Sequence, residues 1–281
     1  MDLVPALNGR YRLEAEIGRG VSGVVYRAVD QTVGTTCAVK VLLPWAQADD
    51  AQRRRLRREA RLAALLRSPH AVAVHELCEG PNGELALVME LLYGQDLGQR
   101  LARQRVWEPR EVARLGAQAL DALAEAHDLG IVHRDLKPGN LFLCERGKQP
   151  ELLKVLDLGV AKITGTGAGS VELSETTRLT VSGGVMGSPA YMSPEQCRDE
   201  PLTPASDLYS LAVVLYQLLA GRLPFVDLQP VKVMLMHNQA PPPPLPTAIA
   251  QHPVGQATLR ALAKGPADRF ADARQMRAAL Q

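Results

Sequence analysis

The sequence predicts an α+β fold of two lobes, because its pattern changes along the chain. Short strand patterns fill roughly the first ninety residues, and helical patterns fill most of the remainder. The two parts would meet at a cleft, with residues 90–96 as the hinge. We expect an N-terminal extension over 1–10, a small lobe over 11–91 and a large lobe over 97–281.

The strand patterns of the first part are short, alternating or β-branched, and bounded by Gly, Asp or Asn. One helix interrupts them at about 48–66, where Leu56, Ala60, Ala63 and Leu66 fall near helical spacing. The expected strands are 11–18, 24–30, 36–42, 71–77 and 84–91.

The second part carries helical patterns separated by Gly, Pro and polar residues. The longest apolar run, 208–220, is too short to cross a bilayer and contains Tyr and Gln, so we expect a buried helix there. The expected helices are 96–104, 109–129, 194–198, 205–220, 229–238, 255–263 and 271–280.

The amino-acid composition argues against several classes of protein, among them nucleic-acid-binding and disulfide-rich proteins. A net charge of +2 does not indicate a nucleic-acid surface. The four cysteines are isolated, which fits neither a disulfide scaffold nor a zinc site and favours a reducing cytoplasm. The N-terminus lacks the features of a signal peptide. We therefore expect a cytoplasmic, soluble protein.

The first motif along the chain that indicates a chemical function is rich in glycine. Gly18, Gly20 and Gly23 match G-x-G-x-x-G-x-V, and glycines let backbone N–H groups approach phosphate oxygens. A dinucleotide-binding fold uses the same spacing, but there the third Gly opens a helix. Here a β-branched strand follows, so the motif predicts a flap over nucleotide phosphates.

Lys40 ends an apolar strand pattern, where a lysine often extends its ammonium to solvent. If Lys40 instead faces the interior, it needs a carboxylate, and Glu59 is the acidic residue within the basic helix. A Lys40–Glu59 pair would point the lysine at the α- and β-phosphates. The seven arginines between 53 and 67 are read first as a solvated face, and otherwise as a site for a phosphorylated loop or an acidic partner.

The segment 131–140, IVHRDLKPGN, is densely polar after an apolar pair. Together with the glycine flap, AVK at 38–40 and D-x-G at 157–159, it closely resembles the catalytic loop of bacterial serine/threonine protein kinases of the eukaryotic type. The resemblance runs from about Tyr11 to about Phe270. It implies a small antiparallel sheet lobe with one regulatory helix, a larger helical lobe, and use of ATP with Mg²⁺ or, alternatively, Mn²⁺.

The resemblance also implies roles for single residues. Asp135 would accept the proton of the substrate hydroxyl, and Lys137 would hold the γ-phosphate. Asn140 and Asp157 would bind the metal ion. Lys40 and Glu59 complete the implied catalytic set. His133 would be structural, and Arg134 would pair with a phosphate on the activation loop.

A nucleotide pocket follows from the same resemblance. Ile17, Val25 and Ala38 would cover the adenine from above and Phe142 from below, with Met89 behind it. Glu90 and Leu92 would offer backbone hydrogen bonds, and Asp96 would reach the ribose. The nucleotide-binding set implied by the resemblance is Ile17, Gly18, Arg19, Gly20, Gly23, Val25, Ala38, Lys40, Met89, Glu90, Leu92, Asp96 and Phe142.

Residues 157–195 would form the activation loop. Ser188 would contact the catalytic Asp and Lys and mark Ser/Thr specificity. Leu158 stands where the family usually has Phe, and we expect it to fill that place. The acceptor hydroxyls we favour are Thr177 and Thr180, with Thr176 and Ser182 as further candidates.

Two further residues would be architectural. Glu195 would form a buried pair with Arg269. Asp207 would cap the long central helix and hold the backbone of the catalytic loop. Both are expected to stabilise the large lobe rather than to take part in the reaction.

Three functions are weighed. The first is an active serine/threonine kinase that phosphorylates itself and acts in bacterial signalling. The second is a scaffold that has lost catalysis, which would lack one of Lys40, Asp135, Asn140 or Asp157, and all four are present. The third is a small-molecule phosphotransferase, which would usually lack the long Ser/Thr-rich loop.

The expected partners are protein substrates, with a transcription factor or another kinase as plausible targets. If these 281 residues are the whole protein, we expect input in trans, from an upstream kinase or from transient self-association through the small lobe.

Overall fold

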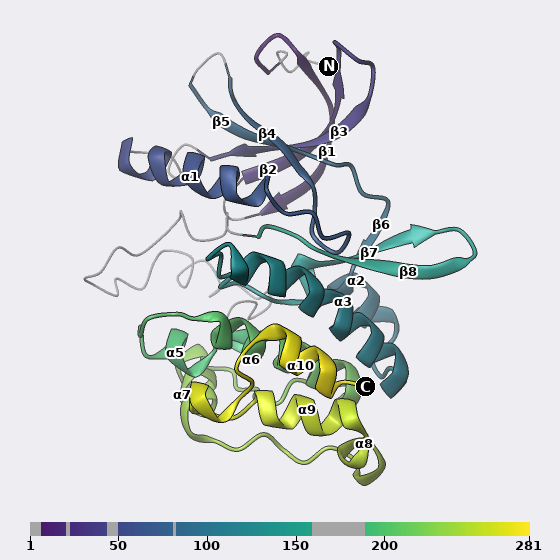
Figure 1. Ribbon diagram of the computed structural model, residues 1–281, viewed down its shortest axis with the longest axis vertical. Coiled ribbons are helices and arrows are strands. Elements are labelled where there is room, and N and C mark those ends of the chain that lie inside the picture. Colours follow the sequence, from purple (N-terminus) through teal and green to yellow (C-terminus); the bar gives the residue numbers. More distant parts are fainter. Residues whose placement is uncertain (1–6, 21–22, 44–49, 81–82, 159–188) are drawn as a thin grey trace.

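The computed structural model describes residues 7–20, 23–43, 50–80, 83–158 and 189–281, except for the side chains of 50–52 and 55 (Figure 1). It confirms the predicted α+β fold, with a sheet lobe above a helical lobe in the view of Figure 1. Within these ranges, no helix combines the length and the apolar character needed to cross a membrane.

The small lobe is a five-stranded antiparallel sheet in the order β1-β2-β3-β5-β4. All five predicted strands are confirmed, with small changes at their ends. The strands are β1 (Tyr11–Gly20), β2 (Gly23–Asp30), β3 (Thr36–Leu42), β4 (Val74–Glu79) and β5 (Leu85–Met89).

Strand β4 begins three residues later than predicted, because the residues before it pair with the other lobe. Ala71 forms a parallel bridge with Val155, and the Val72 N–H donates to the Val155 carbonyl at 3.0 Å. The predicted strand 71–77 is therefore divided between two sheets. Its first residues pair with Val155 of the large lobe, and its later residues pair with β5 in the small lobe. This pairing fastens the sheet lobe to the helical lobe close to the cleft.

Helix α1 (Asp50–Ala63) packs against the edge strand β4. Its predicted apolar side is buried: Leu56, Ala60 and Ala63 are at most 3% exposed. Its arginines at 54, 57, 58 and 61 are exposed, which supports the reading of a solvated face.

The large lobe is helical, with a small sheet in the order β6-β7-β8 at its upper edge. Strands β7 and β8 form a hairpin between the catalytic loop and Asp157. Its strands are β6 (Gly94–Asp96), β7 (Leu141–Arg146) and β8 (Gln149–Val155). Its helices are α2 (Leu97–Arg103), α3 (Pro109–Asp128), α5 (Pro194–Cys197), α6 (Pro204–Ala220), α7 (Pro230–Gln239), α8 (Thr247–Gln251), α9 (Pro253–Ala261) and α10 (Ala273–Ala279). Its short 3₁₀ turns are η2 (Pro138–Asn140), η4 (Pro189–Tyr191) and η5 (Pro266–Asp268).

Helix α6 is the centre of the large lobe and is buried along almost its whole length, as the apolar run predicted. Helices α3 and α9 pack against it. All seven predicted helices of this part are confirmed, whereas the five-residue α8 was not predicted. It follows the run of prolines at 241–244, which reads as a connector in sequence.

A buried ion pair lies inside the large lobe. The Arg269 Nη1 lies 2.7 Å from Glu195 Oε1, and the Nη2 lies 3.2 Å from Oε2. The two side chains are at most 4% exposed. The predicted Glu195–Arg269 pair is thus confirmed, and it ties the start of α5 to the turn before α10.

Candidate active site

A buried carboxylate holds the backbone of the catalytic loop. Asp207 Oδ2 accepts from the His133 N–H and Oδ1 accepts from the Arg134 N–H, both at 2.8 Å. His127 of α3 lies 2.9 Å from the same Oδ2. The predicted role of Asp207 in holding the loop is confirmed.

The other role predicted for Asp207 is wrong. Thr203 is the N-cap of α6, and Asp207 lies one turn inside the helix. The Thr203 N–H donates to Ser206 Oγ at 3.3 Å. Because Asp207 projects from the first turn toward the loop, its oxygens serve the loop amides instead of the helix end.

His133 is structural, as expected. Its side chain is buried, and both ring nitrogens are engaged. Nε2 donates to the Leu156 carbonyl at 2.8 Å, and Nδ1 accepts from the Asp135 N–H at 3.3 Å. A ring with both nitrogens occupied cannot serve as a general base.

Asp135, Lys137 and Asn140 meet in one cluster. Asp135 Oδ2 accepts from Lys137 Nζ at 2.7 Å and from Asn140 Nδ2 at 3.1 Å. Asn140 Nδ2 also donates to the Asp135 carbonyl at 2.7 Å. Asp135 and Lys137 are each about one-third exposed, so a reactant can reach them.

The orientation of the Asn140 amide follows from its partners. Both groups near Nδ2 are acceptors, so the NH₂ must face them and Oδ1 must point elsewhere. Among the described residues Oδ1 accepts no hydrogen bond. That oxygen, with the carboxylate of Asp157, suits the hard-oxygen preference of Mg²⁺, which is often held by one or two protein ligands together with phosphates.

Lys40 is buried, and its partner is not the one predicted. Its Nζ lies 2.8 Å from Asp157 Oδ1 and 2.7 Å from Oδ2, and the expected ion pair with Glu59 is not formed. Helix α1, which carries Glu59, packs over the edge strand β4, two strands away from the Lys40 strand β3. The lysine therefore binds the carboxylate that follows β8 instead.

The ionisation of Asp157 follows from this contact. Burial by itself would raise the pKa of the Asp157 carboxyl, but the Lys40 ammonium beside it holds that pKa below its usual value. The carboxylate is therefore ionised at neutral pH. A metal ion that binds Asp157 would compete with Lys40 for the same oxygens.

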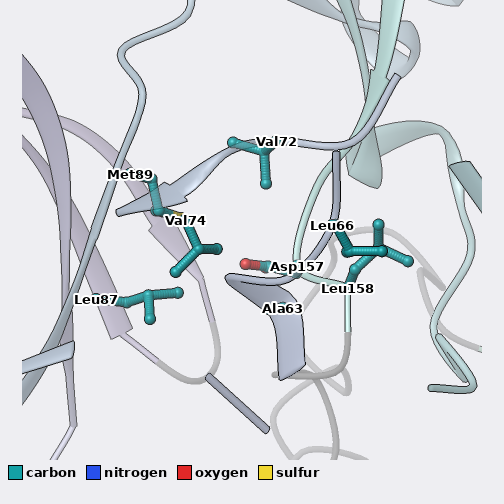
Figure 2. A pocket seen from close by; sticks show the side chains of 8 residues that line it. All are labelled: Ala63, Leu66, Val72, Val74, Leu87, Met89, Asp157 and Leu158. Carbon is teal, nitrogen blue, oxygen red and sulfur yellow. The ribbon is translucent and has the colours of Figure 1, made fainter. Parts of the chain in front are cut away.

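A small apolar cavity adjoins the carboxylate of Asp157, between α1 and strands β4 and β5 (Figure 2). Its free volume is about 10 Å³, close to the space of one water molecule. Leu158 is 2% exposed and lines it, so this residue fills an apolar position as expected. The lining residues are Ala63, Leu66, Val72, Val74, Leu87, Met89, Asp157 and Leu158.

The register of the sheet brings the predicted nucleotide-binding residues side by side. Gly18 lies opposite Val25, and Val25 lies opposite Lys40. In the same way Ala38 of β3 lies opposite Met89 of β5. Across the cleft, Asp96 lies opposite Phe142 in the small sheet of the large lobe.

The remaining predicted nucleotide-binding residues of β1 lie at its exposed end. Ile17 is 51% exposed, as an uncovered lid residue would be. The Arg19 side chain turns back to Glu16, with Nε 3.0 Å from Oε1. Only the backbone of Arg19 thus remains to face a ligand.

The three glycines of the motif differ in what surrounds them. A Cβ on Gly23 would lie 2.4 Å from the Val41 carbonyl oxygen, so the sheet itself requires glycine there. At Gly18 and Gly20, the nearest described atoms would lie 3.9 and 4.0 Å away. The fold leaves these two positions open, so a ligand is the better reason for glycine there.

We expect Gly23→Ala to lower the free energy of unfolding by about 1–3 kcal/mol, because the backbone of β3 must move. Gly18→Ala and Gly20→Ala should leave stability nearly unchanged and raise the KM for ATP several-fold. Urea unfolding and steady-state kinetics on the three variants test this. Equal destabilisation at all three positions would contradict it.

The side chain of Glu90 connects the hinge, residues 90–96, to residues on either side of the cleft. Its Oε1 accepts from the Ala73 N–H and from Lys154 Nζ, both at 2.7 Å. Within the described part of the chain, the Glu90 carbonyl and the Leu92 N–H make no hydrogen bond. Both groups are therefore available to a planar ligand, as predicted. Asp96 Oδ1 caps α2 by accepting from the Gln99 N–H at 3.0 Å.

Comparison with known proteins agrees with this geometry. The model of the protein kinase domain family matches residues 11–251. The chain belongs to the protein kinase family. Its relatives include the serine/threonine-protein kinase pkn3 of Myxococcus xanthus, 40% identical over 97% of this chain, and PknA of Mycobacterium tuberculosis, 37% identical over 94%. This chain covers 49% of the length of the first and 59% of the second.

The fold of this protein kinase domain also matches a solved structure. The crystal structure of the M. tuberculosis PknI kinase domain superposes with a TM-score of 0.73 at 29% identity, and covers 100% of this chain and 97% of that one. The two-lobed architecture is thus the one found in bacterial members of the family.

Some predictions on this kinase domain fall outside the described residues. The candidate acceptors Thr176, Thr177, Thr180 and Ser182, and also Ser188, lie within 159–188. Sequence reasoning missed Gln196, whose Nε2 donates to the Arg134 carbonyl at 2.6 Å. The signal was available: Ser193 and Gln196 have the spacing of a capping box, in which the third residue turns back.

Proposed function

We propose that this chain is the catalytic domain, over residues 11–281, of an ATP- and metal-dependent serine/threonine protein kinase. The observation that carries the proposal is the hydrogen-bonded cluster of Asp135, Lys137 and Asn140, within the same chain as the Lys40–Asp157 pair. These residues would supply a base, two ammonium groups and two oxygen ligands to the reaction.

The roles follow from the chemistry of each group. Asp135 accepts the proton of the substrate hydroxyl, and Lys137 neutralises charge on the transferred phosphate. Lys40, held here by Asp157, would contact the nucleotide phosphates. Asn140 and Asp157 would hold Mg²⁺ or Mn²⁺, which supplies positive charge to the phosphates.

The nucleotide lies between the lobes. The glycines of the flap and Arg19 offer backbone N–H groups to its phosphates, and Glu90 and Leu92 offer the hinge backbone to the adenine. The apolar walls come from Ile17, Val25, Ala38, Met89 and Phe142, and the ribose contact from Asp96.

The experiment is transfer of label from γ-labelled ATP to casein and to the chain itself, with Mg²⁺, with Mn²⁺ and with a chelator. We expect metal-dependent phosphoserine and phosphothreonine on both. ATP binding without transfer would favour a scaffold, and transfer to small hydroxyl or amine acceptors alone would favour a small-molecule phosphotransferase.

Regulation by phosphorylation is supported by Arg134. Its Nε is buried and has no hydrogen-bond partner in the described residues, and its guanidinium forms no ion pair there. A phosphate would satisfy this nitrogen, because it forms strong charge-assisted hydrogen bonds with a guanidinium group. We propose that a phosphorylated hydroxyl, added by the chain itself or by an upstream kinase, binds Arg134.

We expect phosphatase treatment to reduce wild-type transfer about tenfold and to have little effect on Arg134→Ala, which should be weakly active in both states. Arg61→Ala, an exposed arginine of α1, is the control and should behave as the wild type. Phosphate-counting mass spectrometry verifies the treatment. An Arg134→Ala enzyme that remains as phosphatase-sensitive as the wild type would refute the pairing.

A further inference from the structure

The turn η4 is the first described segment after the activation-loop region, and it packs against helices α6 and α7. Three residues after Met192, Glu195 enters the buried pair with Arg269, and Gln196 bonds to the Arg134 carbonyl. Arg134 directly precedes Asp135. The chain that continues from η4 is therefore joined by the Gln196–Arg134 hydrogen bond to the loop that carries the proposed base.

A buried histidine of α7 is hydrogen-bonded to the turn η4. His237 is fully buried, and its Nε2 lies 3.1 Å from the Ala190 carbonyl oxygen. Its Nδ1 lies 2.9 Å from the Tyr209 hydroxyl of α6. The rings of Tyr209 and Phe225 contact it edge-on, with centroids 5.7 and 4.9 Å away.

The chemistry of the partners sets the position of every proton. A carbonyl oxygen only accepts, so the proton of the neutral imidazole is on Nε2. Nδ1 then accepts from the Tyr209 O–H, and the Tyr209 oxygen accepts from Lys264 Nζ at 3.3 Å. The chain of donors runs from Lys264 through Tyr209 and His237 to Ala190.

The imidazole stays neutral at physiological pH. Burial, together with the nearby ammonium of Lys264, lowers the pKa of His237 to about 4. Burial, and then the guanidinium of Arg269, lowers the pKa of Lys264 to about 8, so the lysine remains mostly charged at pH 7. The direction of the hydrogen bonds is thus constant over the working range of pH.

We propose that His237 is a positioning residue for protein-substrate binding: its Nε2–H fixes the Ala190 carbonyl, and so fixes the turn η4, whose chain continues through Gln196 to the loop of the proposed base. The inference deepens the proposed kinase function and rests on it. The Tyr191 hydroxyl, bonded to Gln217 Oε1 at 2.7 Å, is a second fastening of the same turn to α6. None of the proposed nucleotide contacts involves His237 or η4, so nucleotide binding should not depend on this contact.

Three substitutions test separately the two hydrogen bonds of the His237 ring, from Nε2 to Ala190 and from Tyr209 to Nδ1. His237→Phe keeps a ring beside Phe225 and loses both bonds. His237→Gln has an amide long enough to donate near Nε2, and His237→Asn has one that reaches only the Nδ1 position. Tyr216→Phe is the control, because it removes another buried hydroxyl of α6, bonded to the Pro243 carbonyl.

We expect His237→Phe and His237→Asn to lower kcat/KM for a peptide substrate about tenfold, mainly through KM, with the KM for ATP within twofold of the wild type. His237→Gln should recover most of the loss, and Tyr216→Phe should show none. Independently of activity, hydrogen exchange at the Met192 amide, which donates to the Pro189 carbonyl, should accelerate in His237→Phe.

The proposal is overturned if the three His237 variants lose activity equally, if the KM for ATP rises as much as that for peptide, or if Tyr216→Phe matches His237→Phe. A wild type that transfers no phosphate would refute the kinase function instead. In that case unchanged Met192 exchange in His237→Phe would still overturn the positioning role, and faster exchange would support it.

Discussion

Asp135→Asn should reduce the turnover number for phosphate transfer by about 10²–10⁴-fold while the chain stays folded. The amide has the shape of the carboxylate and keeps one oxygen near Lys137 and Asn140. It cannot take up a proton, however, so the substrate hydroxyl loses its base. The measurement is single-turnover transfer from labelled ATP, with unfolding by urea recorded in parallel.

The control for this variant is Asp128→Asn, which removes the same charge from an exposed pair with Arg274 at the far end of α3. It should transfer phosphate at the wild-type rate. ATP binding should be nearly unchanged in both variants. If Asp135→Asn kept more than a tenth of the wild-type turnover, the assignment of the base would be wrong.

Glu195→Gln should lower the free energy of unfolding by about 3–5 kcal/mol, because it leaves the guanidinium of Arg269 buried without its counter-charge. All five N–H donors of Arg269 are in use. Two bind Glu195, and the other three bind the carbonyl oxygens of Ala205, Ala263 and Lys264. A lysine could not satisfy this set, so Arg269→Lys should also destabilise the chain strongly.

Thermal unfolding checks this, and a midpoint lower by roughly 6–20 °C is expected for a chain of this size. Glu200→Gln is the matched control, because Glu200 pairs with Arg198 at the surface only five residues away. Its midpoint should stay at the wild-type value. Similar shifts in the two variants would mean that burial of the Glu195 pair is not what matters.

The catalytic cluster could be predicted because its members are near neighbours in sequence. Asp135, Lys137 and Asn140 lie within six positions, and Pro138 keeps the segment from continuing as a helix. Few backbone paths of that length exist, so residue types and spacing nearly determine the contacts. The same holds for Ser193 and Gln196 at the start of α5.

Contacts between distant elements could not be predicted in the same way. The choice of Asp157 over Glu59 by Lys40 depends on where α1 rests on the sheet, which is a matter of packing across the whole small lobe. The late start of β4 depends on Val155, eighty or so residues further along the chain. His237 belongs to no motif in the sequence, and only the fold brings the Ala190 carbonyl to it.

The hydrogen bonds from two amides of the catalytic loop to Asp207 have a consequence for how the chain folds. The carboxylate is more than seventy residues from the loop that it holds, and its third partner, His127, belongs to α3. The loop therefore gains its shape only after α3 and α6 have docked, late in a search for long-range contacts. If Asp135 is the base as proposed, we expect a partly folded chain to lack an ordered catalytic loop and therefore to transfer no phosphate.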